Sequence, residues 1–537
     1  MSAESAEPRP TAPGPSVNPW FIAMAVSIAT FMEVLDTSIA NVALRYIAGG
    51  LSAANNDSEW VITSYLAANA AVLLLSGWLS QYLGRRNYYL ASVALFTAAS
   101  AACGLATSLE QLILFRILQG IGGGGLQPVT QAVLVDTFPP EKQGSAQTLF
   151  GVSALIAPVL GPTLGGYIAD NYSWEWIFLI NVPMGLIAFG LNFWLLEDPE
   201  YLKEERRALR SKPLNFDYIG LGLIVIVMST MEVILSKGQE WDWFGDPFWR
   251  IQALSAIFAA CLAGMIVWES RHPAPILNLG PFRDRNFVAC GVVAYVTFAI
   301  LYASMTLLPG MLQTLFGYNA EWSGLVMSPA GLFSIPTMVV VGFLIGKRID
   351  ARWLIMVGAV FMAGGAYWFA LLNLDVSPGQ IIWPRVVQQI GTAFMFAPLS
   401  VAAFIYLPKE LRGAAAGIFA VLRNEGGSAG TSMGKTLVQR RLPLHTDRLG
   451  ENLNPLSGPF NDALQSGRRF FEGVTGDPVT SREMALEAID NLRQQQAGAL
   501  AYFDGFYLFA ILALGIIPLA LLMRRSVAEP GQHIGME

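Results

Sequence analysis

The chain has 537 residues and a formal net charge of −6; 54% of its residues are hydrophobic and only 13% are charged. Soluble domains usually carry about 25% charged residues, so this composition excludes a disordered protein, a nucleic-acid binder and an ordinary soluble enzyme. It predicts an all-α polytopic membrane protein. The three histidines lie outside the apolar runs, so we expect no metal and no cofactor.

Residues 1–19 are polar and rich in proline, which predicts a disordered tail and not a cleaved signal peptide. Beyond them, stretches of about 20 apolar residues predict fourteen transmembrane helices. These stretches are residues 20–42, 60–83, 88–108, 111–136, 146–169, 176–196, 218–236, 249–269, 287–316, 322–346, 353–373, 381–406, 413–439 and 502–523. An even number of spans puts both termini on one side of the membrane.

Lysine and arginine residues predict which side that is. Nineteen of them fall in the tails and loops that would share a side with the termini. The short loops opposite contain only Arg45, Lys237 and Arg250. The positive-inside rule therefore places both termini in the cytoplasm.

Two passages of the chain repeat each other. Residues 116–122 in the fourth predicted span and residues 385–391 in the twelfth both read R-x-x-Q-x-I-G. A weaker pair, Gly-x-Leu followed by basic residues, comes after the second and tenth spans. Two pairs in the same order, eight spans apart, predict two homologous six-helix bundles, an arrangement typical of secondary transporters. The predicted layout is a six-helix bundle at 20–196, a cytoplasmic linker at 197–217, an inserted transmembrane hairpin at 218–269, a second bundle at 270–523 and a cytoplasmic tail at 524–537.

Charged residues within apolar spans are functional candidates because hydrocarbon makes them costly. Glu33 and Asp36 lie three residues apart in the first span, and therefore on one face of a helix. Two such carboxylates in a poor dielectric repel each other, so we expect at least one to bind a proton, as a proton-coupled carrier requires. A helix-end carboxylate that faces water is the alternative reading.

Arg116 lies deep in the fourth span and needs an anionic or carbonyl partner, because a guanidinium does not lose its proton. Asp36 and Glu33 are both candidate partners, and a purely structural tie between helices is the alternative. Asp136, at the end of the same span, is expected to be a solvent-facing charge.

The thirteenth span carries Arg423 and Glu425. Glu425 is a candidate second proton-binding acid, paired with Arg385 or held in a local salt bridge. Glu232, near the outer end of the inserted seventh span, stays outside the predicted site.

Glycine and proline cluster in the fifth span, where the chain reads Gly161-Pro162-Thr-Leu-Gly165-Gly166. Proline kinks a helix, and glycines let a neighbouring helix approach closely. These four residues therefore predict a conformational hinge. The chain contains no G-x-x-x-x-G-K-[ST] sequence, so we expect a proton gradient and not ATP to supply the energy.

Together these passages resemble the major facilitator superfamily, specifically its fourteen-span drug:proton antiporters of the EmrB/QacA type, over about residues 20–525. The resemblance is carried by residues 35–43 of the first span, 77–86 of the following loop, 116–122 and 161–166. It implies two six-helix bundles plus two inserted central helices, and proton-driven multidrug efflux of hydrophobic or amphipathic molecules by alternating access.

The resemblance also implies a location in a bacterial inner membrane. The charged residues of the spans and the motifs of the resemblance together give the remaining candidate site residues. As charge partners or cavity residues we expect Arg116, Arg385, Arg423, Asn41 and Gln119. As conformational motifs we expect Gly77, Gly84, Arg85 and Arg86, beside the glycines and proline of the fifth span. Gln81 and Tyr82 replace the Asp-Arg of the family's loop motif, which weakens the expected charge latch to a neighbouring helix. Glu425 stands where an uncharged residue is expected.

The loop at 440–501 is far longer than a connector needs, and its residues 481–492 repeat apolar side chains at helical spacing. The EmrB-like resemblance implies that this loop docks a periplasmic adaptor protein, which works with an outer-membrane channel. A functionless insertion is the alternative. For the whole protein, the alternatives are an exporter of one endogenous metabolite, such as a siderophore or lipid-like product, and a proton symporter that imports a solute. The antiporter-like residues 161–166 argue against import.

Overall fold

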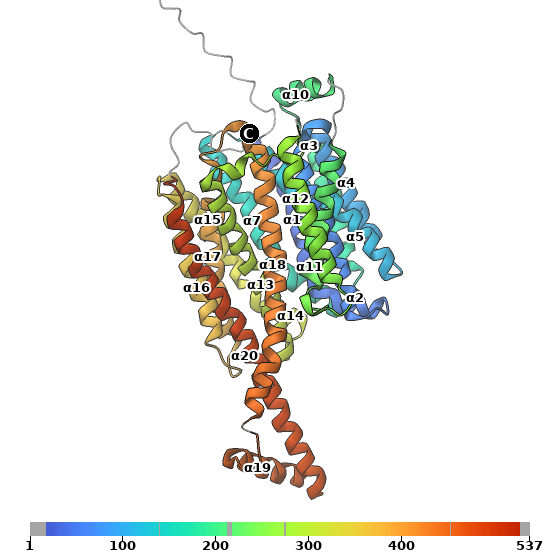
Figure 1. Cartoon of the computed structure of the whole chain (residues 1–537), viewed down its shortest axis with the longest axis vertical. Helices are drawn as coiled ribbons and strands as arrows, with labels where there is room; N and C mark the ends of the chain where they lie inside the picture. Colours follow the sequence, from blue (N-terminus) through green and yellow to red (C-terminus); the bar gives the residue numbers. More distant parts are fainter. Residues whose placement is uncertain (1–17, 139, 212–216, 273–274, 452, 527–537) are drawn as a thin grey trace, which may run out of the picture.

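The computed structural model describes residues 18–138, 140–211, 217–272, 275–451 and 453–526. All regular secondary structure in these ranges is helical, and no strand occurs in them. The helices stand side by side in one bundle, from which a helical extension projects (Figure 1).

The first bundle expected from the sequence contains nine helices, some of which are halves of a broken span. They are α1 (Pro19–Gly50), α2 (Asn55–Ser58), α3 (Trp60–Leu83), α4 (Arg85–Gly104), α5 (Leu109–Gly123), α6 (Leu126–Thr137), α7 (Pro140–Asn171), α8 (Trp176–Leu179) and α9 (Asn181–Leu195). The helix of the fourth predicted span breaks between α5 and α6, at a run of four glycines.

The middle of the chain adds α10 (Glu200–Ser211), which lies outside the bundle, and the antiparallel pair α11 (Tyr218–Lys237) and α12 (Arg250–Arg271). The remaining helices are α13 (Arg285–Leu315), α14 (Ala320–Met327), α15 (Pro329–Gly346), α16 (Ala351–Ala370), α17 (Pro378–Phe404), α18 (Lys409–Gly450), α19 (Gly458–Thr475) and α20 (Pro478–Leu522). We call α1–α9 the N-half and α13–α20 the C-half.

Within the described residues, ten helices are long and apolar enough to cross a membrane. An eleventh is added if the two parts of α7, which bend by 41° at residue 159, count as one span. This number does not confirm the fourteen predicted spans. The other predicted stretches, 88–108, 111–136 and 413–439, are helical as α4, α5 with α6, and α18, but they fall short of the same test of length and hydropathy.

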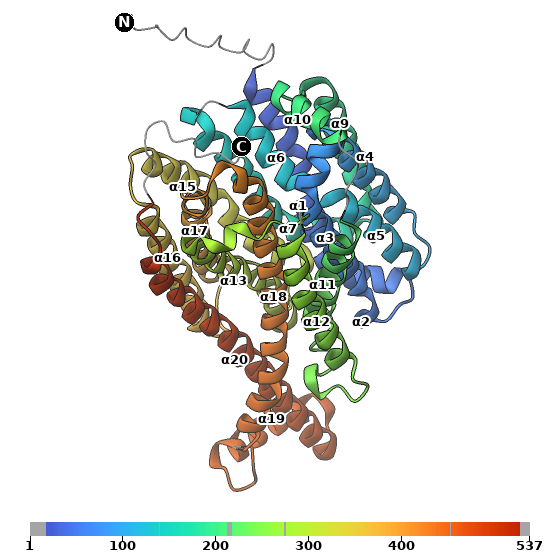
Figure 2. The same cartoon turned by 45° about the horizontal axis from the view of Figure 1, so that its top comes forward.

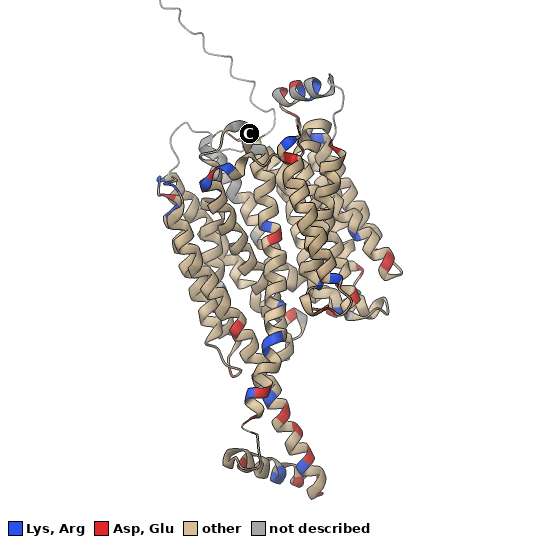
Figure 3. Ribbon diagram, in the orientation of Figure 1, with Lys and Arg blue, Asp and Glu red and all other residues tan. Residues whose placement is uncertain are grey.

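The two ends of the bundle differ. The start of α1, the helix α10 and the end of α20 lie at one end, which we call the termini end (Figures 1 and 2). The short helix α2 and the extension with α19 at its tip lie at the other, which we call the α19 end. Lys, Arg, Asp and Glu gather at both ends and along the extension, while the middle of the bundle is largely free of them (Figure 3).

The segment expected to be a loop at 440–501 is mostly helical. Helix α18 continues to Gly450, α19 follows, and α20 runs without a break for 45 residues from the extension into the bundle. Apolar spacing indicated a helix only from residue 481 onward, so the helix α19 was not expected. The stretch 458–475 contains glycines and charges, which hid its amphipathic pattern.

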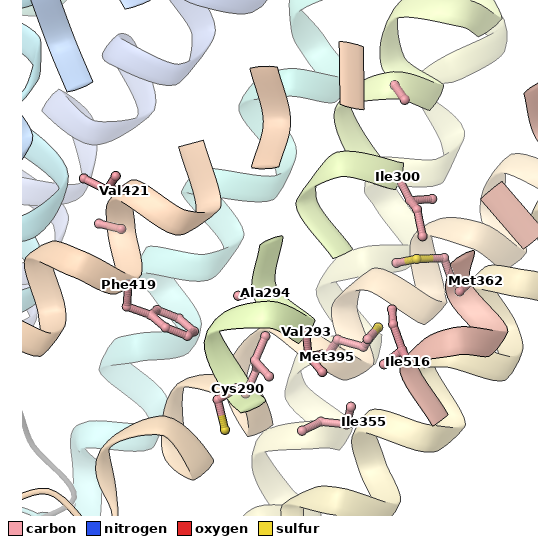
Figure 4. Close-up of a cluster of buried hydrophobic side chains, with 14 of the residues drawn as sticks. Cys290, Val293, Ala294, Ile300, Ile355, Met362, Met395, Phe419, Val421 and Ile516 are labelled. Atoms are coloured by element: carbon pink, nitrogen blue, oxygen red, sulfur yellow. The ribbon is translucent and has the colours of Figure 1, made fainter. Parts of the chain in front are cut away.

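Apolar side chains form one large buried cluster centred on each half, and each cluster also includes residues of the other half. In the C-half, residues of α13, α16, α17, α18 and α20 interlock in one buried cluster, with Met362 and Met395 filling the space between helices (Figure 4). The N-half has a corresponding cluster around Tyr89 and Phe96, which are fully buried. Close packing therefore joins the helices within each half and also holds the two halves together in the described structure.

Candidate functional site

Asp36 forms the centre of a buried hydrogen-bond network in the N-half. It lies on α1, is fully buried, and accepts from three side chains on two other helices. Its Oδ2 accepts from Nη1 of Arg116 at 2.6 Å, and its Oδ1 accepts from Nε2 of Gln119 at 2.9 Å and from Nδ2 of Asn181 at 2.6 Å. The carboxylate therefore has a full set of donors and a counter-ion.

Arg116 is contacted from several helices, although its buried Nη2 has no hydrogen-bond partner among the described residues. Its Nε donates to the carbonyl of Val61 on α3 at 3.0 Å, and its Nη1 also donates to Oε1 of Gln119 at 2.8 Å. The guanidinium carbon lies 4.2 Å from the ring centroid of Tyr65. Of the two partners considered from the sequence, the structure pairs Arg116 with Asp36. A buried ion pair persists only where such extra hydrogen bonds offset the loss of hydration, and here they tie α1, α3, α5 and α9 together.

Glu33, one turn before Asp36, has different surroundings. It lines a cavity of about 490 Å³ between the halves, and its Oε1 accepts from Nδ2 of Asn69 at 3.2 Å. Among the described residues Glu33 forms no ion pair. An ionised Glu33 would thus be a nearly buried charge without a contacting counter-ion, which favours proton binding at this residue.

The cavity is lined from both halves and from the inserted helix α11. Its charged and amide-bearing lining residues are Glu33, Asn41, Arg45, Asn56, Glu59, Asn69, Gln127, Glu232, Gln313, Asn424 and Lys435. The rings of Tyr65 and Tyr302 and the carbons of Met305 and Pro309 supply apolar surface. Asn41 is exposed, and its amide donates to the carbonyl of Thr37 at 3.0 Å. A cavity of this size with mixed walls fits a drug-sized amphipathic molecule.

Toward the termini end an aromatic cluster packs the halves together. Phe150 on α7 and Phe396 on α17 have ring centroids 6.3 Å apart, and Phe298 on α13 lies 6.2 Å from Phe396. The guanidinium carbon of Arg423 lies 5.6 Å from the Phe298 centroid and 5.8 Å from that of Phe396. Arg423 therefore packs against these rings, and among the described residues it makes no contacting ion pair, although Glu33 lies within electrostatic range. This packing separates the cavity from the termini end.

At the α19 end an ion pair joins the two halves across the cavity. Nζ of Lys435 on α18 lies 3.0 Å from Oε1 of Glu59, which precedes α3. Lys237 on α11 lies 3.9 Å from the other oxygen of Glu59. The sequence analysis counted Lys237 only as a loop charge and assigned no role to Glu59 or Lys435, because each of the three lies close to the end of an apolar run.

The C-half repeats the Arg-Gln pair of the N-half but lacks its carboxylate. Nη1 of Arg385 donates to Oε1 of Gln388 at 2.8 Å, and Nε2 of Gln388 donates to Oγ of Ser304 on α13 at 2.8 Å. Ser304 thus occupies the position that Asp36 occupies in the N-half. In the described part of the chain, Arg385 has no ion-pair partner, and Glu425 lies beside Glu232 of α11 instead.

The loop between α3 and α4 is fixed by charges that the sequence analysis partly misjudged. Gly84 has a φ of +90°, which favours glycine, and a Cβ there would overlap Asp198 and Arg206. Arg85 forms an ion pair with Asp136, whose side chain is only 12% exposed. The expectation of a solvent-facing Asp136 was therefore wrong, because α4 brings Arg85 to the end of α6.

Arg86 completes this latch: its backbone N–H donates to Asp198 at 2.8 Å, and its Nη2 donates to the carbonyl of Phe193 at 2.8 Å. Charged contacts thus hold the loop although Gln81 and Tyr82 replace the usual Asp-Arg. Gly77 is exposed, and a Cβ there would meet no other atom within 4 Å.

The glycines of α7 lie against α1. A Cβ at Gly161 would overlap the side chain of Ser38, and one at Gly165 would lie 3.1 Å from Cγ2 of Ile39. Gly166 is buried, and Pro162 lines the cavity. Helix α7 therefore packs its glycine face on the helix that carries Glu33 and Asp36, beside the bend in α7.

The sequence profile of the Major Facilitator Superfamily matches residues 26–431. The chain belongs to the Major Facilitator Superfamily. It is 35% identical to the fatty acid resistance protein FarB of Neisseria gonorrhoeae, over 96% of this chain and 97% of the relative. It is 36% identical to the multidrug export protein EmrB of Escherichia coli strain K12, over 84% of this chain and 85% of the relative. The predicted family and its EmrB-like branch are confirmed.

Solved structures agree on the fold. A bacterial homologue of the human lysosomal transporter Spinster, in an inward-facing and occupied conformation, superimposes with a TM-score of 0.55 at 16% identity, covering 96% of this chain and 100% of that one. The human organic anion transporter MFSD10 gives a TM-score of 0.57 at 13% identity, covering 94% and 100% of the two chains. The chain is a multi-pass membrane transporter of this all-helical fold.

Several residues of the site escaped the sequence analysis. Asn181 and Asn69 contact the two acidic residues of α1, and Ser100 accepts from Nδ2 of Asn181 at 3.1 Å. A signal was present, since amide side chains are rare in apolar runs. Their partners, however, come from other helices, and only the packing of the bundle reveals them.

Proposed function

We propose that this protein is a proton-driven antiporter that exports hydrophobic or amphipathic small molecules from the cytoplasm of a bacterium. The observation that carries the proposal is the contrast between two acids one turn apart on α1. Glu33 opens to a drug-sized cavity, and Asp36 is locked to Arg116 directly behind it. Relatives named for multidrug export and for fatty acid resistance support the same activity.

The geometry supports a sequence of proton steps. A proton enters through the cavity and binds to a carboxylate oxygen of Glu33. When a proton passes to Asp36, its ion pair with Arg116 is lost, and the donors Gln119 and Asn181 lose a charged acceptor. The contacts that hold α1, α5 and α9 together weaken, which allows α1 and α7 to shift and the seam at the termini end to open.

The proposal includes a topology of fourteen spans with both termini in the cytoplasm, as the distribution of Lys and Arg indicates. In that orientation the termini end is cytoplasmic and closed by the aromatic cluster, and the cavity lies toward the periplasm. The described conformation then corresponds to the stage at which substrate leaves and a proton enters. Helices α11 and α12 are the inserted hairpin.

We further propose that the extension formed by α18, α19 and α20 binds a periplasmic adaptor protein, which leads substrate to an outer-membrane channel. The extension projects from the α19 end, which is periplasmic in the proposed topology (Figure 1). Its tip exposes the large apolar side chains of Leu456, Phe470, Val474 and Val479. Exposed apolar groups clustered on a projecting element are typical of a contact surface for another protein.

Export of one lipid-like metabolite is the second candidate. The observation in its favour is the relative named for fatty acid resistance. Transport of a panel containing fatty acids, cationic dyes and neutral hydrophobic drugs separates the two. A single accepted compound class supports the dedicated exporter, and several unrelated classes support multidrug export.

Proton coupling is tested in everted membrane vesicles with a fluorescent probe of the pH gradient. Addition of a transported compound from the panel should dissipate the gradient for the wild type. Asp36→Asn should reduce this response by about tenfold or more, which corresponds to ~1.4 kcal/mol or more in the barrier. Glu110→Gln, an exposed acid on α5, serves as the matched control and should respond normally. Wild-type vesicles that transport a compound without proton movement would refute antiport.

A further inference from the structure

Helix α11 lies over the seam between the two halves. It packs against α3 of the N-half, α18 of the C-half and its own partner α12 (Figure 1). Thr63 of α3 and Ser236 of α11 are hydrogen-bonded through their hydroxyl groups. The inserted hairpin is therefore a third part of the cavity wall, in contact with both halves.

Two acidic residues meet where α11 contacts α18. Glu232 on α11 is 3% exposed and lines the cavity, and Glu425 on α18 is also 3% exposed. The two carboxylates lie within range of mutual repulsion. Ser428, one turn after Glu425 on α18, lies next to Glu232 and lines the same cavity. Oε2 of Glu425 is buried and has no hydrogen-bond partner among the described residues.

The surrounding charges do not neutralise this pair. Arg423 is two residues from Glu425, which places it on another face of α18, against phenylalanine rings. Lys435 and Lys237 are both engaged with Glu59, and Lys237 also with Glu240 at 2.5 Å. Several other titratable groups lie on the elements packed around α11 and α18. Tyr65 of α3 and Tyr302 of α13 line the same cavity as Glu232, and Tyr295 of α13 faces Glu425. Further groups include Arg250, Glu269 and Arg271 at the ends of α12, Arg285 at the start of α13, and Asp504 of α20, which is bound to Arg441 and His445.

We propose that Glu232 and Glu425 form a carboxyl pair that shares one proton, and that this pair is a second proton-binding site located at the inserted hairpin. Two carboxylates buried against each other without a counter-ion repel strongly when both are ionised, so they favour binding one proton, and that proton supplies the missing hydrogen bond. The step is simple protonation: an O–H bond forms on one carboxylate oxygen and is shared with the other carboxylate.

The site differs from the one formed by Glu33 and Asp36, because it lies between the hairpin and the C-half. Its proton is accessible from the cavity through Glu232. Loss of the proton leaves two charges that repel each other, which pushes α11 away from α18. If the protein is a proton-coupled carrier as proposed above, the hairpin then responds to the same proton gradient as the N-half.

Infrared difference spectra of the full-length protein in lipid vesicles, recorded as pH is raised, test the pair directly. The wild type should lose a C=O stretching band of a protonated carboxyl. Glu232→Gln and Glu425→Gln should each remove the same component of that band. The double variant should lose no more than either single variant, because a shared proton is lost only once.

Glu110→Gln is the control and should leave the spectrum unchanged. Glu425→Asp keeps a carboxyl group, so it should retain the band at a shifted frequency and show that the protein still folds. Additive losses in the double variant, or a band unaffected by both single variants, would overturn the shared proton. Loss of the band on addition of sodium or potassium at fixed pH would show that the pair binds a metal cation. That result would also overturn the proposal of a shared proton.

This outcome is independent of the transport assay. Vesicles in which no compound moves protons would refute antiport and leave the infrared band in place. A missing band with intact proton-coupled transport would refute the pair and leave the function to Glu33 and Asp36.

Discussion

Asp36 and Arg116 are both fully buried in the N-half, and each stabilises the buried charge of the other. Removal of one partner from such a pair leaves an uncompensated buried charge, which typically costs about 3–5 kcal/mol. Glu33 has no such partner and can change its charge without breaking an ion pair. In the proposed mechanism the two neighbouring acids therefore differ in what a proton would do to them: it would break the ion pair with Arg116 at Asp36, and it would remove an isolated charge at Glu33.

The planar guanidinium of Arg116 makes three separate hydrogen bonds, to Asp36, Gln119 and the carbonyl of Val61. We expect Arg116→Lys to keep the ion pair but lose the bond to Val61, because an ammonium cannot bridge these directions. Arg116→Ala should lose all three bonds and reduce proton-coupled transport much more, with a clearly lower melting temperature. Melting temperature and vesicle transport are measured on both variants.

Arg385→Lys in the C-half is the matched control, since Arg385 donates to Gln388 without a carboxylate partner. Its effect on transport should be smaller than that of Arg116→Ala. Wild-type transport by Arg116→Ala would show that the buried ion pair has no part in coupling.

The sequence pointed to the charged residues of this site more readily than to its amides. Asp36 and Arg116 stand out in apolar runs because a charge in hydrocarbon is costly. Asn181 contacts the same carboxylate, yet nothing along the chain distinguishes it from Asn192, which donates to the carbonyl of Ala25 at 2.9 Å. Which amide faces an acid is decided by how α9 packs on α1, and that is a property of the assembled bundle.

At the scale of helices, α7 combines a bend with a glycine face. The bend lies between the helix parts that end at Pro158 and begin at Leu160, and the glycines bring α7 onto α1. On its other side α7 meets α14, where a Cβ at Gly324 would overlap the backbone of Thr163. One helix thus contacts the acidic helix of its own half and the seam with the other half.

Gly165→Leu should slow transport, because the new side chain would push α7 away from Ile39 of α1. Expression and insertion should be largely retained, because the change lies at one face of a long helix. Initial transport rates in vesicles, normalised to protein amount, give the measurement. Gly190→Leu on α9, where a Cβ meets nothing within 4 Å, should transport normally. Equal rates for both variants would show that close approach at Gly165 is not needed.

The extension gives a second prediction at this scale. With residues 445–495 replaced by a short Gly/Ser linker, the purified protein should still transport in liposomes, because the cavity residues remain. The same variant should lose resistance in intact cells that depends on passage through the outer membrane. Co-purification of an adaptor protein with the shortened chain at wild-type yield would contradict docking at the extension.

Across the whole molecule, the two halves touch differently at the two ends. Apolar rings close the seam at the termini end, and the ion pair of Glu59 with Lys435 spans it at the α19 end. Burial of aromatic rings away from water stabilises the contact between the halves, whereas an exposed ion pair adds little to its stability. The described state is therefore held closed mainly at the termini end, and the ion pair is the easier contact to break and remake.

Glu59→Cys with Lys435→Cys, in a chain whose native Cys103, Cys261 and Cys290 are replaced, should allow a short thiol cross-linker to join the halves. Transport should stop after cross-linking and return after cleavage of the linker, if alternating access separates these residues. A cysteine pair at Arg468 and Glu472, one turn apart on α19, controls for the reagent. Full transport by the cross-linked protein would show that this end does not move.

The fold as a whole was foreseen through the internal repeat and the family resemblance, and the comparisons confirm the family. The number of membrane spans was harder to predict from the sequence. Predicted stretches such as 88–108 and 413–439 contain enough polar and charged residues to fall below a hydropathy test even though they form helices. Residues such as Arg423 and Glu425 lower the apolar character of α18, and they are the same residues that make it a functional candidate.

The unbroken length of α20 has a mechanical consequence. Its 45 residues rise about 68 Å at 1.5 Å per residue, roughly twice the ~30 Å hydrocarbon core of a bilayer. A rod anchored in the C-half for part of its length acts as a lever for the rest. If the C-half tilts against the N-half during transport, a small tilt inside the membrane becomes a larger displacement of α19, once in each transport cycle. A protein bound to the tip would be displaced in each turnover. Its binding would in turn resist the tilt of the C-half.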